Sequence, residues 1–219
     1  MVGFPLHPQR LSGFLPHPND AALIAVLLPF APVVTWPLGF AVVGASVSRN
    51  AVLGVLVALF VLGSPKQRLA LVTLVLIAAL AYTHQDAELF TRGKARIGQW
   101  LVAVDMWRDA PWVGWGPATF GDHYLSRLDK LRPLPFGIGP DIQLVPWAHS
   151  LYLEQLAERG LMGLIALLLP LGYALRCGSR RTQAAVAALL VMGIFDLTLL
   201  KPWVVGAVWG LVALAKGES

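Results

Sequence analysis

The chain has 219 residues, of which 57% are hydrophobic and only 13% are charged. Soluble domains carry about 25% charged residues, and the mean hydropathy here is +0.66, so the composition excludes an ordinary soluble domain and indicates an integral membrane protein. The net charge of +5 comes from basic residues that are scattered or that flank apolar runs. This distribution favours membrane orientation over nucleic-acid binding, and we expect no nucleic-acid partner. The single cysteine, Cys177, excludes an internal disulfide.

The first 20 residues are polar and contain no apolar core long enough for a signal peptide. The apolar runs that follow predict an all-α protein with about six to seven transmembrane helices. They occupy residues 20–34, 38–47, 51–63, 69–83, 151–175, 182–200 and 204–215. A spanning helix needs about 20 residues, so the shorter runs must borrow flanking residues or tilt. The first two runs could form one interrupted span, but Thr35, Trp36 and Pro37 favour a turn between two spans.

Basic residues in the short connections predict the orientation. Lys66 and Arg68 lie in one connection, Arg176, Arg180 and Arg181 lie in another, and Lys216 follows the last run. The positive-inside bias places all of these in the cytoplasm. The long segment 84–148 then lies on the periplasmic side.

Residues 84–148 are too long for a simple connection and hold several aromatic residues, among them Trp100, Trp107, Trp112, Trp115, Phe120 and Tyr124, so we expect them to be ordered. Apolar residues recur at helical spacing between residues 94 and 109, which predicts an amphipathic helix lying on the bilayer and ending before Pro111. The expected organisation is a single membrane domain. It comprises N-terminal membrane helices (1–83), a periplasmic loop (84–148) and C-terminal membrane helices (149–219).

His149 precedes a long apolar stretch, and we expect it in the first turn of a helix where the membrane meets water. A helix N-terminus disfavours the imidazolium form and favours a bound anion. A neutral histidine beside an anion site can act as a general base near neutral pH. The alternative is an interfacial histidine that only caps the helix, and this stretch alone favours the alternative.

Arginines near the predicted outer face could bind that anion. Arg49 is the only charged residue between Asp20 and Lys66, and it lies against the positive-inside bias. Guanidinium groups match phosphate oxygens bidentately, so two or three such arginines would form a diphosphate site. Arg96 and Arg10 are the other candidates, although each alone would be an ordinary interfacial charge.

Other chemistries lack their motifs. His149 and Glu154 do not have the spacing of a zinc helix, and we expect neither a metal site nor a cofactor. Asp196 lies within an apolar run, where pairing with Lys201 is the simpler account. Among the loop carboxylates, Asp105, Asp122 and Asp141 could bind sugar hydroxyls, although solvated charges are the simpler interpretation.

Four motifs in order resemble the O-antigen ligase and polymerase family of bacterial membrane glycosyltransferases. They are R-L-S-G-F from Arg10 with P-N from Pro18, S-V-S-R-N-A from Ser46, R-x-x-x-W from Arg96 with P-W-V-G-W-G-P-A-T-F from Pro111, and H-S-L-Y-L-E-Q-L-A-E-R-G-L-M-G from His149. Many relatives have His-Asn where this chain has His149-Ser150. Family members typically have further helices before the first motif, so we expect either a fragment or a second chain that supplies them.

The resemblance implies a glycosyltransferase C-like fold in the bacterial inner membrane with a periplasmic active site. It also implies metal-independent transfer of a glycan from undecaprenyl diphosphate to a glycan or lipid acceptor. By resemblance His149 is the base and Arg49, Arg96 and Arg10 hold the diphosphate. Tyr152, Trp100, Trp115 and Asp122 are further candidates for substrate contact.

Three alternatives stay open. A polysaccharide polymerase and a protein O-oligosaccharyltransferase use the same chemistry on other acceptors. A bicarbonate or small-solute transporter should instead show polar residues near mid-span and broken helices in matching halves. The polar candidates here gather on one predicted face, which favours the transferase.

Overall fold

All regular structure in the described part of the chain is helical. The structure is a computed structural model, and it describes residues 49–82, 87–131, 145, 147–195, 199 and 201–218. No strand occurs among these residues, so the predicted all-α class is confirmed for them. The predicted spans 20–34 and 38–47 lie outside the described residues.

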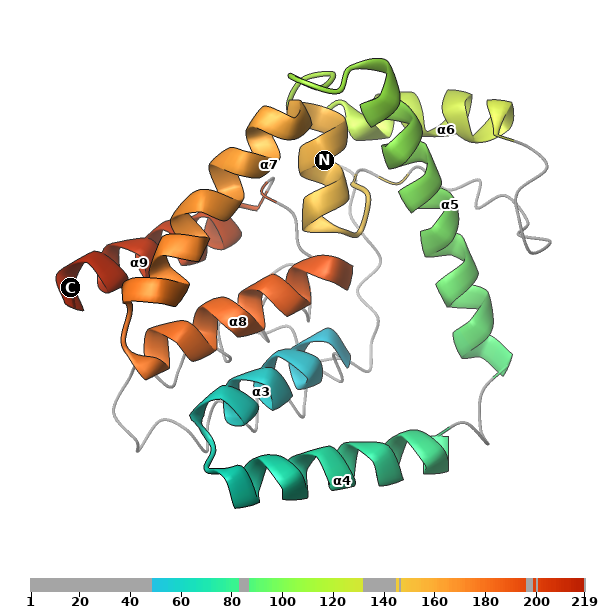
Figure 1. The fold of residues 1–219 in the computed structure, drawn as a ribbon. Coiled ribbons are helices and arrows are strands. Elements are labelled where there is room, and N and C mark those ends of the chain that lie inside the picture. Colours follow the sequence, from blue (N-terminus) through green and yellow to red (C-terminus); the bar gives the residue numbers. More distant parts are fainter. Residues whose placement is uncertain are drawn as a thin grey trace.

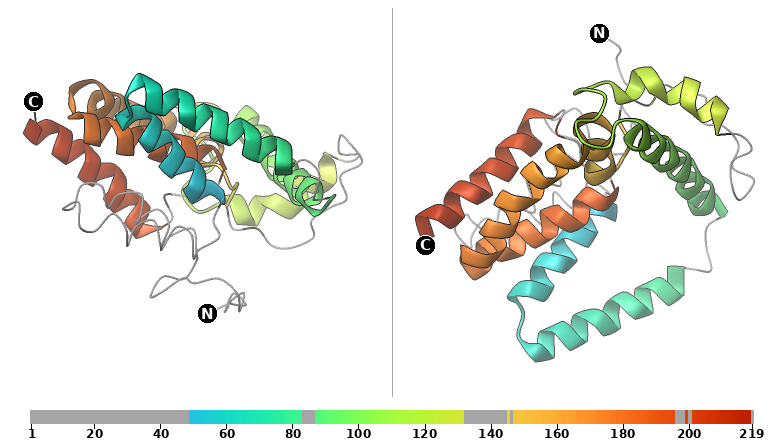
Figure 2. Two further views of the ribbon diagram at one scale, coloured as in Figure 1. Left: turned by 90° about the horizontal axis from the view of Figure 1, so that it is seen from below. Right: turned by 45° about the horizontal axis from the view of Figure 1, so that its top comes forward.

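The helices follow the apolar pattern of the sequence closely. They are α3 (Arg49–Leu62), α4 (Pro65–Tyr82), α5 (Ala87–Asp109), α6 (Phe120–Lys130), α7 (Leu151–Cys177), α8 (Arg180–Phe195) and α9 (Pro202–Glu218). Figures 1 and 2 show α3, α8, α9 and the second half of α7 side by side, with α4 along one edge and α5 and α6 at the other end.

The turn between α3 and α4 is specified locally. Gly63 closes α3 by donating its N–H to the Leu59 carbonyl at 2.8 Å. Ser64 precedes Pro65, the first residue of α4, and the Gln67 side chain accepts the Ser64 backbone N–H at 2.8 Å. Proline at the first helical position and a glutamine that reaches back to the cap both favour a helix start.

Two basic connections lie at the same end of the helix layer. Arg68 Nε donates to the Phe60 carbonyl at 2.9 Å, and Arg180 Nη2 donates to the Val61 carbonyl at 2.8 Å. Both arginines therefore bind carbonyls near the end of α3, where cations are favoured. The C-terminal end of α9 lies on this side as well (Figure 1). The basic residues predicted to share one membrane face thus share one end of the fold.

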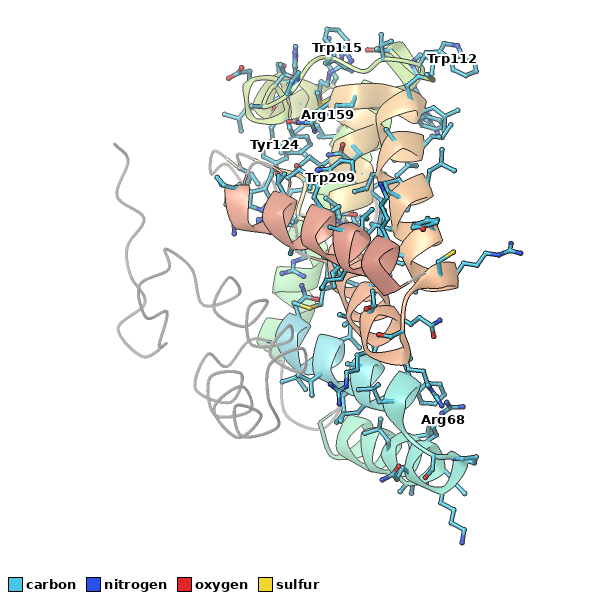
Figure 3. The ribbon with its side chains drawn as sticks, turned by 90° about the vertical axis from the view of Figure 1, so that its left-hand side faces the viewer. Arg68, Trp112, Trp115, Tyr124, Arg159 and Trp209 are labelled. Atoms are coloured by element: carbon cyan, nitrogen blue, oxygen red, sulfur yellow. The ribbon has the colours of Figure 1, made fainter. Side chains whose placement is uncertain are left out.

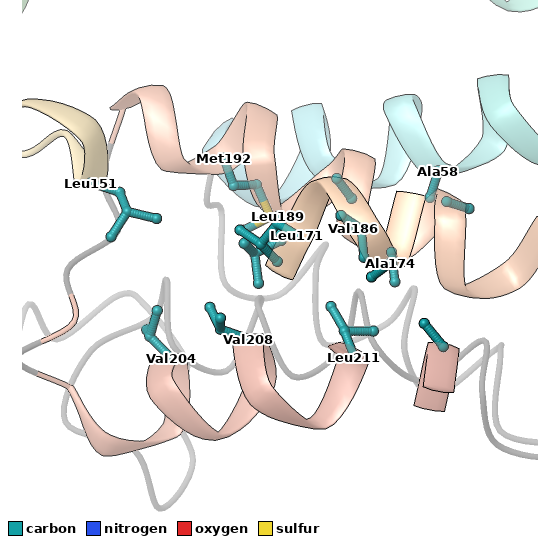
Figure 4. Packing of buried hydrophobic residues seen from close by; sticks show 14 of the residues in the cluster. Ala58, Leu151, Leu171, Ala174, Val186, Leu189, Met192, Val204, Val208 and Leu211 are labelled. Carbon is teal, nitrogen blue, oxygen red and sulfur yellow. The ribbon is translucent and has the colours of Figure 1, made fainter. Parts of the chain in front are cut away.

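The main core, here called the first core, joins α7, α8 and α9. Leu171 and Ala174 of α7 and Leu189 of α8 are fully or almost fully buried. Val204 and Val208 of α9 face them across the interface, as Figure 4 shows. Ala58 of α3 joins the same core. This packing fixes the positions of α8 and α9 against the second half of α7 (Figure 1).

A second core holds α5 and α6 against the first turns of α7. Val102, Ala103 and Met106 of α5 have no exposed surface, and they pack with Phe120 and Tyr124 of α6. The predicted helix at 94–109 is therefore confirmed but begins earlier, at Ala87. Its most buried face contacts protein rather than lipid, because α6 supplies an apolar partner that the sequence pattern of α5 alone does not reveal.

Helix length tests the predicted number of membrane spans. In the part of the chain that the structure describes, Leu151–Cys177 is the one helix both long and apolar enough to cross a membrane. Val52–Leu62 and Val204–Gly217 are shorter apolar helices. One helix thus supports the prediction of a membrane protein. The predicted total of six to seven transmembrane helices stays a prediction.

Candidate functional site

The end of α8 is where three of the predicted motifs meet. The Asn50 side-chain amide, at the start of α3, donates to the Met192 carbonyl at 3.0 Å. Trp100 of α5 lies against Phe195, with ring centroids 6.3 Å apart. The Tyr152 hydroxyl in the first turn of α7 donates to the Leu190 carbonyl. Segments far apart in the sequence therefore converge on the last turns of α8.

His149, three residues before Tyr152, has an unusual backbone conformation. The sequence predicted His149 in the first turn of the helix, and this prediction is wrong. Ser150 is the N-cap and Leu151 begins α7, so His149 lies just before the helix. Its φ angle is +50°, in the left-handed region. Only a few per cent of non-glycine residues adopt this region, and such strain concentrates at functional sites. The ring of His149 lies 5.4 Å from that of Trp147.

Buried indole donors accompany the histidine. The Nε1–H groups of Trp100 and Trp147 are buried, and neither finds a hydrogen-bond acceptor among the described residues. Buried polar groups usually have a partner, so each exception calls for an explanation such as an absent ligand or water. The Lys201 ammonium lies 5.1 Å from the Trp147 ring centroid, which adds a positive charge beside this indole. An oxygen-rich anionic ligand would suit both the donors and the charge.

The structure describes only some of the arginines that were predicted to bind the diphosphate. Arg96 lies one turn before Trp100 on α5 and is half-buried. Arg49 is the first residue of α3, next to Asn50, although its side chain is not among the described ones. Arg10, Asp141 and Asp196 lie outside the described residues. The starts of α3 and α7 add two helix N-termini, which favour anions.

A clasp between the turn after α5 and a break in α7 fixes the helix that follows His149. Gly160 has φ +62° and ψ −164°, so α7 bends sharply there (Figure 1). The turn fills the break with four backbone hydrogen bonds. Trp115 and Gly116 donate to the Ala157 and Glu158 carbonyls at 3.1 and 2.8 Å, while Leu161 and Met162 donate to those of Pro111 and Trp112 at 2.8 and 3.1 Å.

Two glycines make this close approach possible. A methyl group on Gly160 would overlap the backbone of Trp112, and one on Gly114 would overlap the backbone of Glu158. Both glycines also have positive φ angles, at which L-residues are strained. The turn that contains Gly114 and Gly116 therefore holds α7 in place.

Glu158 completes the clasp from inside the protein. Its side chain is fully buried, and its carboxylate accepts the backbone N–H groups of Ala118 at 2.9 Å and Phe120 at 3.2 Å. Phe120 begins α6, so the negative charge lies at a helix N-terminus, where it is favoured. Arg159 adds an ion pair at 3.6 Å. Glu158 therefore anchors α6 to the helix segment that follows His149.

Trp115 and Asp122 lie away from the end of α8. The Trp115 indole donates to the Met106 carbonyl at 2.8 Å, and its ring contacts His123 and the guanidinium of Arg127. Asp122 is exposed in the first turn of α6. Trp115 thus supports the α5–α6 pair, and substrate contact by either residue stays a prediction.

Arg127 forms a brace between α6 and α5. Its Nη1 atom lies 2.7 Å from carboxylate oxygens of both Asp105 and Asp109. Burial opposes its charge, but hydrogen bonds and charge attraction from Asp109 and Asp105 outweigh it and raise the pKa of Arg127 above its ordinary value. Asp105, considered as a sugar ligand or a solvated charge, is instead part of this ion pair.

Replacing Arg127 by methionine should destabilise the α5–α6 pair. Methionine keeps the apolar stem but leaves Asp105 and Asp109 without their cation. Because Asp109 is 55% exposed, water screens part of the loss, and we expect about 1–3 kcal/mol of unfolding free energy to be lost. Thermal unfolding in detergent measures it. Lys130→Met, at an exposed position of the same helix, is the control and should change stability little.

A comparison with protein-family models found a match. The family model Wzy_C, described as O-Antigen ligase, matches residues 33–168, which is more than half of the chain. The chain belongs to the O-antigen ligase family. A search of curated proteins found no match.

Members of the O-antigen ligase family are glycosyltransferase-like enzymes, typically of the inner membrane. The match covers the S-R, R-x-x-x-W and His149 motifs, which are those that approach the end of α8. In the described part of this family member, no group of three or more His, Cys, Asp or Glu side chains could hold a metal ion.

The clasp in this member of the O-antigen ligase family was not predicted from its sequence. Glu158 and Gly160 belong to the quoted A-E-R-G run, but neither residue was given a role of its own. A signal was present, because an acidic residue and a glycine interrupt the apolar pattern within three positions. Its partner, Gly114, lies in another segment, so the sequence alone did not indicate the contact.

Proposed function

We propose that the protein transfers a glycan from an undecaprenyl-diphosphate-linked donor to an acceptor hydroxyl at the periplasmic face of the inner membrane. The observation that carries the proposal is the convergence of the starts of α3 and α7 and of Trp100 on the end of α8. The convergence brings together residues from three motifs of the family. Its buried indole donors suit an oxygen-rich ligand.

His149 would be the general base. The acceptor hydroxyl is a weak nucleophile until a base within hydrogen-bond reach removes its proton. The hydroxyl oxygen attacks the anomeric carbon of the donor sugar, the bond from that carbon to the diphosphate oxygen breaks, and the proton passes to an imidazole nitrogen of His149. Undecaprenyl diphosphate leaves with the bonding electrons.

Arginines would stabilise the leaving group. Arg49, Arg96 and Arg10 are the proposed diphosphate ligands, because fixed guanidinium groups neutralise the charge that develops as the diphosphate departs. Tyr152, Trp100, Trp115 and Asp122 are the proposed substrate contacts. Since arginines supply the charge neutralisation, the proposal includes transfer without a metal ion, and a chelator should leave the rate unchanged.

The proposed setting is a multi-pass membrane protein with six to seven spans. Residues 1–83 and 149–219 would form its membrane helices and residues 84–148 its periplasmic loop. The lipid-linked glycan, a glycan or lipid acceptor and the bilayer are the proposed partners. The grouping of Arg68 and Arg180 at one end of the helices supports a cytoplasmic face opposite the end of α8.

The direct test is to incubate the purified full chain with an undecaprenyl-diphosphate-linked glycan and a panel of acceptors. The panel contains a lipid A–core oligosaccharide, a second donor molecule and a hydroxyl-bearing protein. Glycan transfer to the first identifies a ligase, to the second a polymerase and to the third a protein glycosyltransferase. A chain that binds the donor but leaves all three unmodified would contradict the proposal.

Replacing Arg96 by lysine should weaken donor binding. Lysine keeps the positive charge but loses the bidentate fork, and loss of a charge-assisted hydrogen bond costs about 1.5–3 kcal/mol, so donor affinity should fall by about 10-fold or more. The same substitution at Arg49 should have a similar effect. Equilibrium binding of a labelled lipid diphosphate measures both. Arg108→Lys, at an exposed position of α5, is the control, and a matching affinity in all three variants would reduce Arg49 and Arg96 to membrane anchors.

A further inference from the structure

An exposed apolar patch lies where α7 bends. It consists of Trp112, Val113 and Met162, which are 65%, 73% and 60% exposed. Figure 3 shows Trp112 at the edge of the molecule, pointing away from the helices. Large apolar side chains with this much exposure, gathered in one place, mark an interaction surface when they are fixed in position.

The patch is held in place by the clasp. Met162 donates its backbone N–H to the Trp112 carbonyl at 3.1 Å, and Leu161 donates to the Pro111 carbonyl at 2.8 Å. The chain cannot turn Trp112 and Val113 inward without breaking these bonds. Backbone hydrogen bonds to α7 therefore fix the position of the apolar surface.

The patch continues a row of exposed apolar residues along α7. Met162, Ile165, Leu169 and Tyr173 follow one another at spacings of three or four and are all exposed, Leu169 by 69%. Such spacing places them on one face of the helix. This helix is also the one described helix with the length and hydropathy of a membrane span. The patch thus extends a surface whose composition suits lipid.

Helix length places the patch in the outer half of the bilayer. From Met162 to Arg176, the basic residue in the last turn of α7, the helix rises by about 21 Å at about 1.5 Å per residue. The hydrocarbon core is about 30 Å thick, and any tilt shortens the vertical rise further. With Arg176 at the cytoplasmic boundary, the bend at Gly160 lies no farther out than the outer headgroups.

The chemistry of the patch also fits this depth. Tryptophan is enriched where hydrocarbon meets headgroups. The exposed Arg108 precedes the turn by a few residues. Cations beside apolar anchors favour anionic headgroups.

We propose that Trp112, Val113 and Met162 form a lipid-contacting anchor that inserts into the outer leaflet of the bilayer. Through the clasp, this anchor would set the depth of the segment Leu151–Arg159 and therefore of His149. The proposal rests on the membrane orientation given under the proposed function. The sequence predicted that the helix at 94–109, now part of α5, lies on the bilayer. In this proposal the turn after α5 makes the bilayer contact instead.

Site-specific quenching tests the anchor. A cysteine replaces Val113 in a Cys177→Ser background, carries a small fluorophore and is reconstituted in vesicles of phosphatidylcholine with phosphatidylglycerol. Quenchers are iodide in the water and nitroxides attached near the ester linkage or near the methyl end of the lipid chain. The matched control is Ser126→Cys, at an exposed position of α6. The experiment needs neither the glycan donor nor the glycan acceptor.

An anchor about 5–10 Å below the headgroups should be quenched most by the nitroxide near the ester linkage and at least several-fold less by iodide than the control. Iodide quenching equal to that at Ser126 would overturn the proposal by placing the turn in water. Protection from every quencher would also overturn it, because another protein surface would then cover the patch. Since the readout is independent of transfer, failure of the enzymatic proposal would leave this result interpretable.

Discussion

Replacing His149 by alanine is expected to lower glycan turnover by about 10²–10⁴-fold, the usual contribution of a general base. The variant should still fold and bind donor, because the proposed diphosphate contacts come from arginines on other segments. Steady-state transfer and equilibrium donor binding, measured on one preparation, separate the two effects.

His123→Ala is the matched control for this prediction. The His123 ring packs on Trp115, with centroids 4.6 Å apart, and belongs to the α5–α6 pair rather than to the end of α8. Its loss should reduce turnover only slightly. Equal losses in the two variants would mean that histidine removal acts through folding, and the assignment of His149 as base would lose its support.

The second large effect is expected at Gly160. Gly160→Ala should lower the melting temperature in detergent by at least about 4 °C, because backbone strain at a positive φ costs about 1–3 kcal/mol and the added methyl group overlaps the Trp112 backbone. Relief of this overlap requires the turn to leave the break in α7. We therefore expect faster proteolysis of the turn as well.

Gly172→Ala provides the control within the same helix. Nothing lies within 4 Å of a methyl group at Gly172, and alanine favours a helix over glycine by about 1 kcal/mol. Its melting temperature should therefore match or exceed that of the wild type. If Gly160→Ala is equally stable, the clasp contributes nothing to stability and the bend has another cause.

The apolar runs predicted the long helices, although the shorter α6 was not predicted. The run 151–175 begins where α7 begins, and α4 begins four residues before the run 69–83, at Pro65, where Ser64 and Gln67 give local signals for a helix start. Such signals act over a few residues, so they can be recognised without knowing the fold.

Features that depend on distant contacts were not predicted. The predicted helix at 94–109 was assigned to the bilayer surface, because an apolar stripe has the same spacing whether it faces lipid or α6. The break at Gly160 needs a turn from another segment to satisfy its backbone, and the strain at His149 has no sequence pattern of its own. For the site, two of the candidates, Trp100 and Tyr152, contact α8, whereas the role of Glu158 was not predicted.

The most direct test of the account is glycan transfer by His149→Asn. Asparagine tolerates the left-handed backbone conformation, as histidine does, and keeps a hydrogen-bonding side chain, but it cannot accept the acceptor proton. The account predicts a folded variant with wild-type donor affinity and transfer reduced by about 10²-fold or more. A variant that transfers glycan at the wild-type rate would show that His149 holds the chain in position and is not the base.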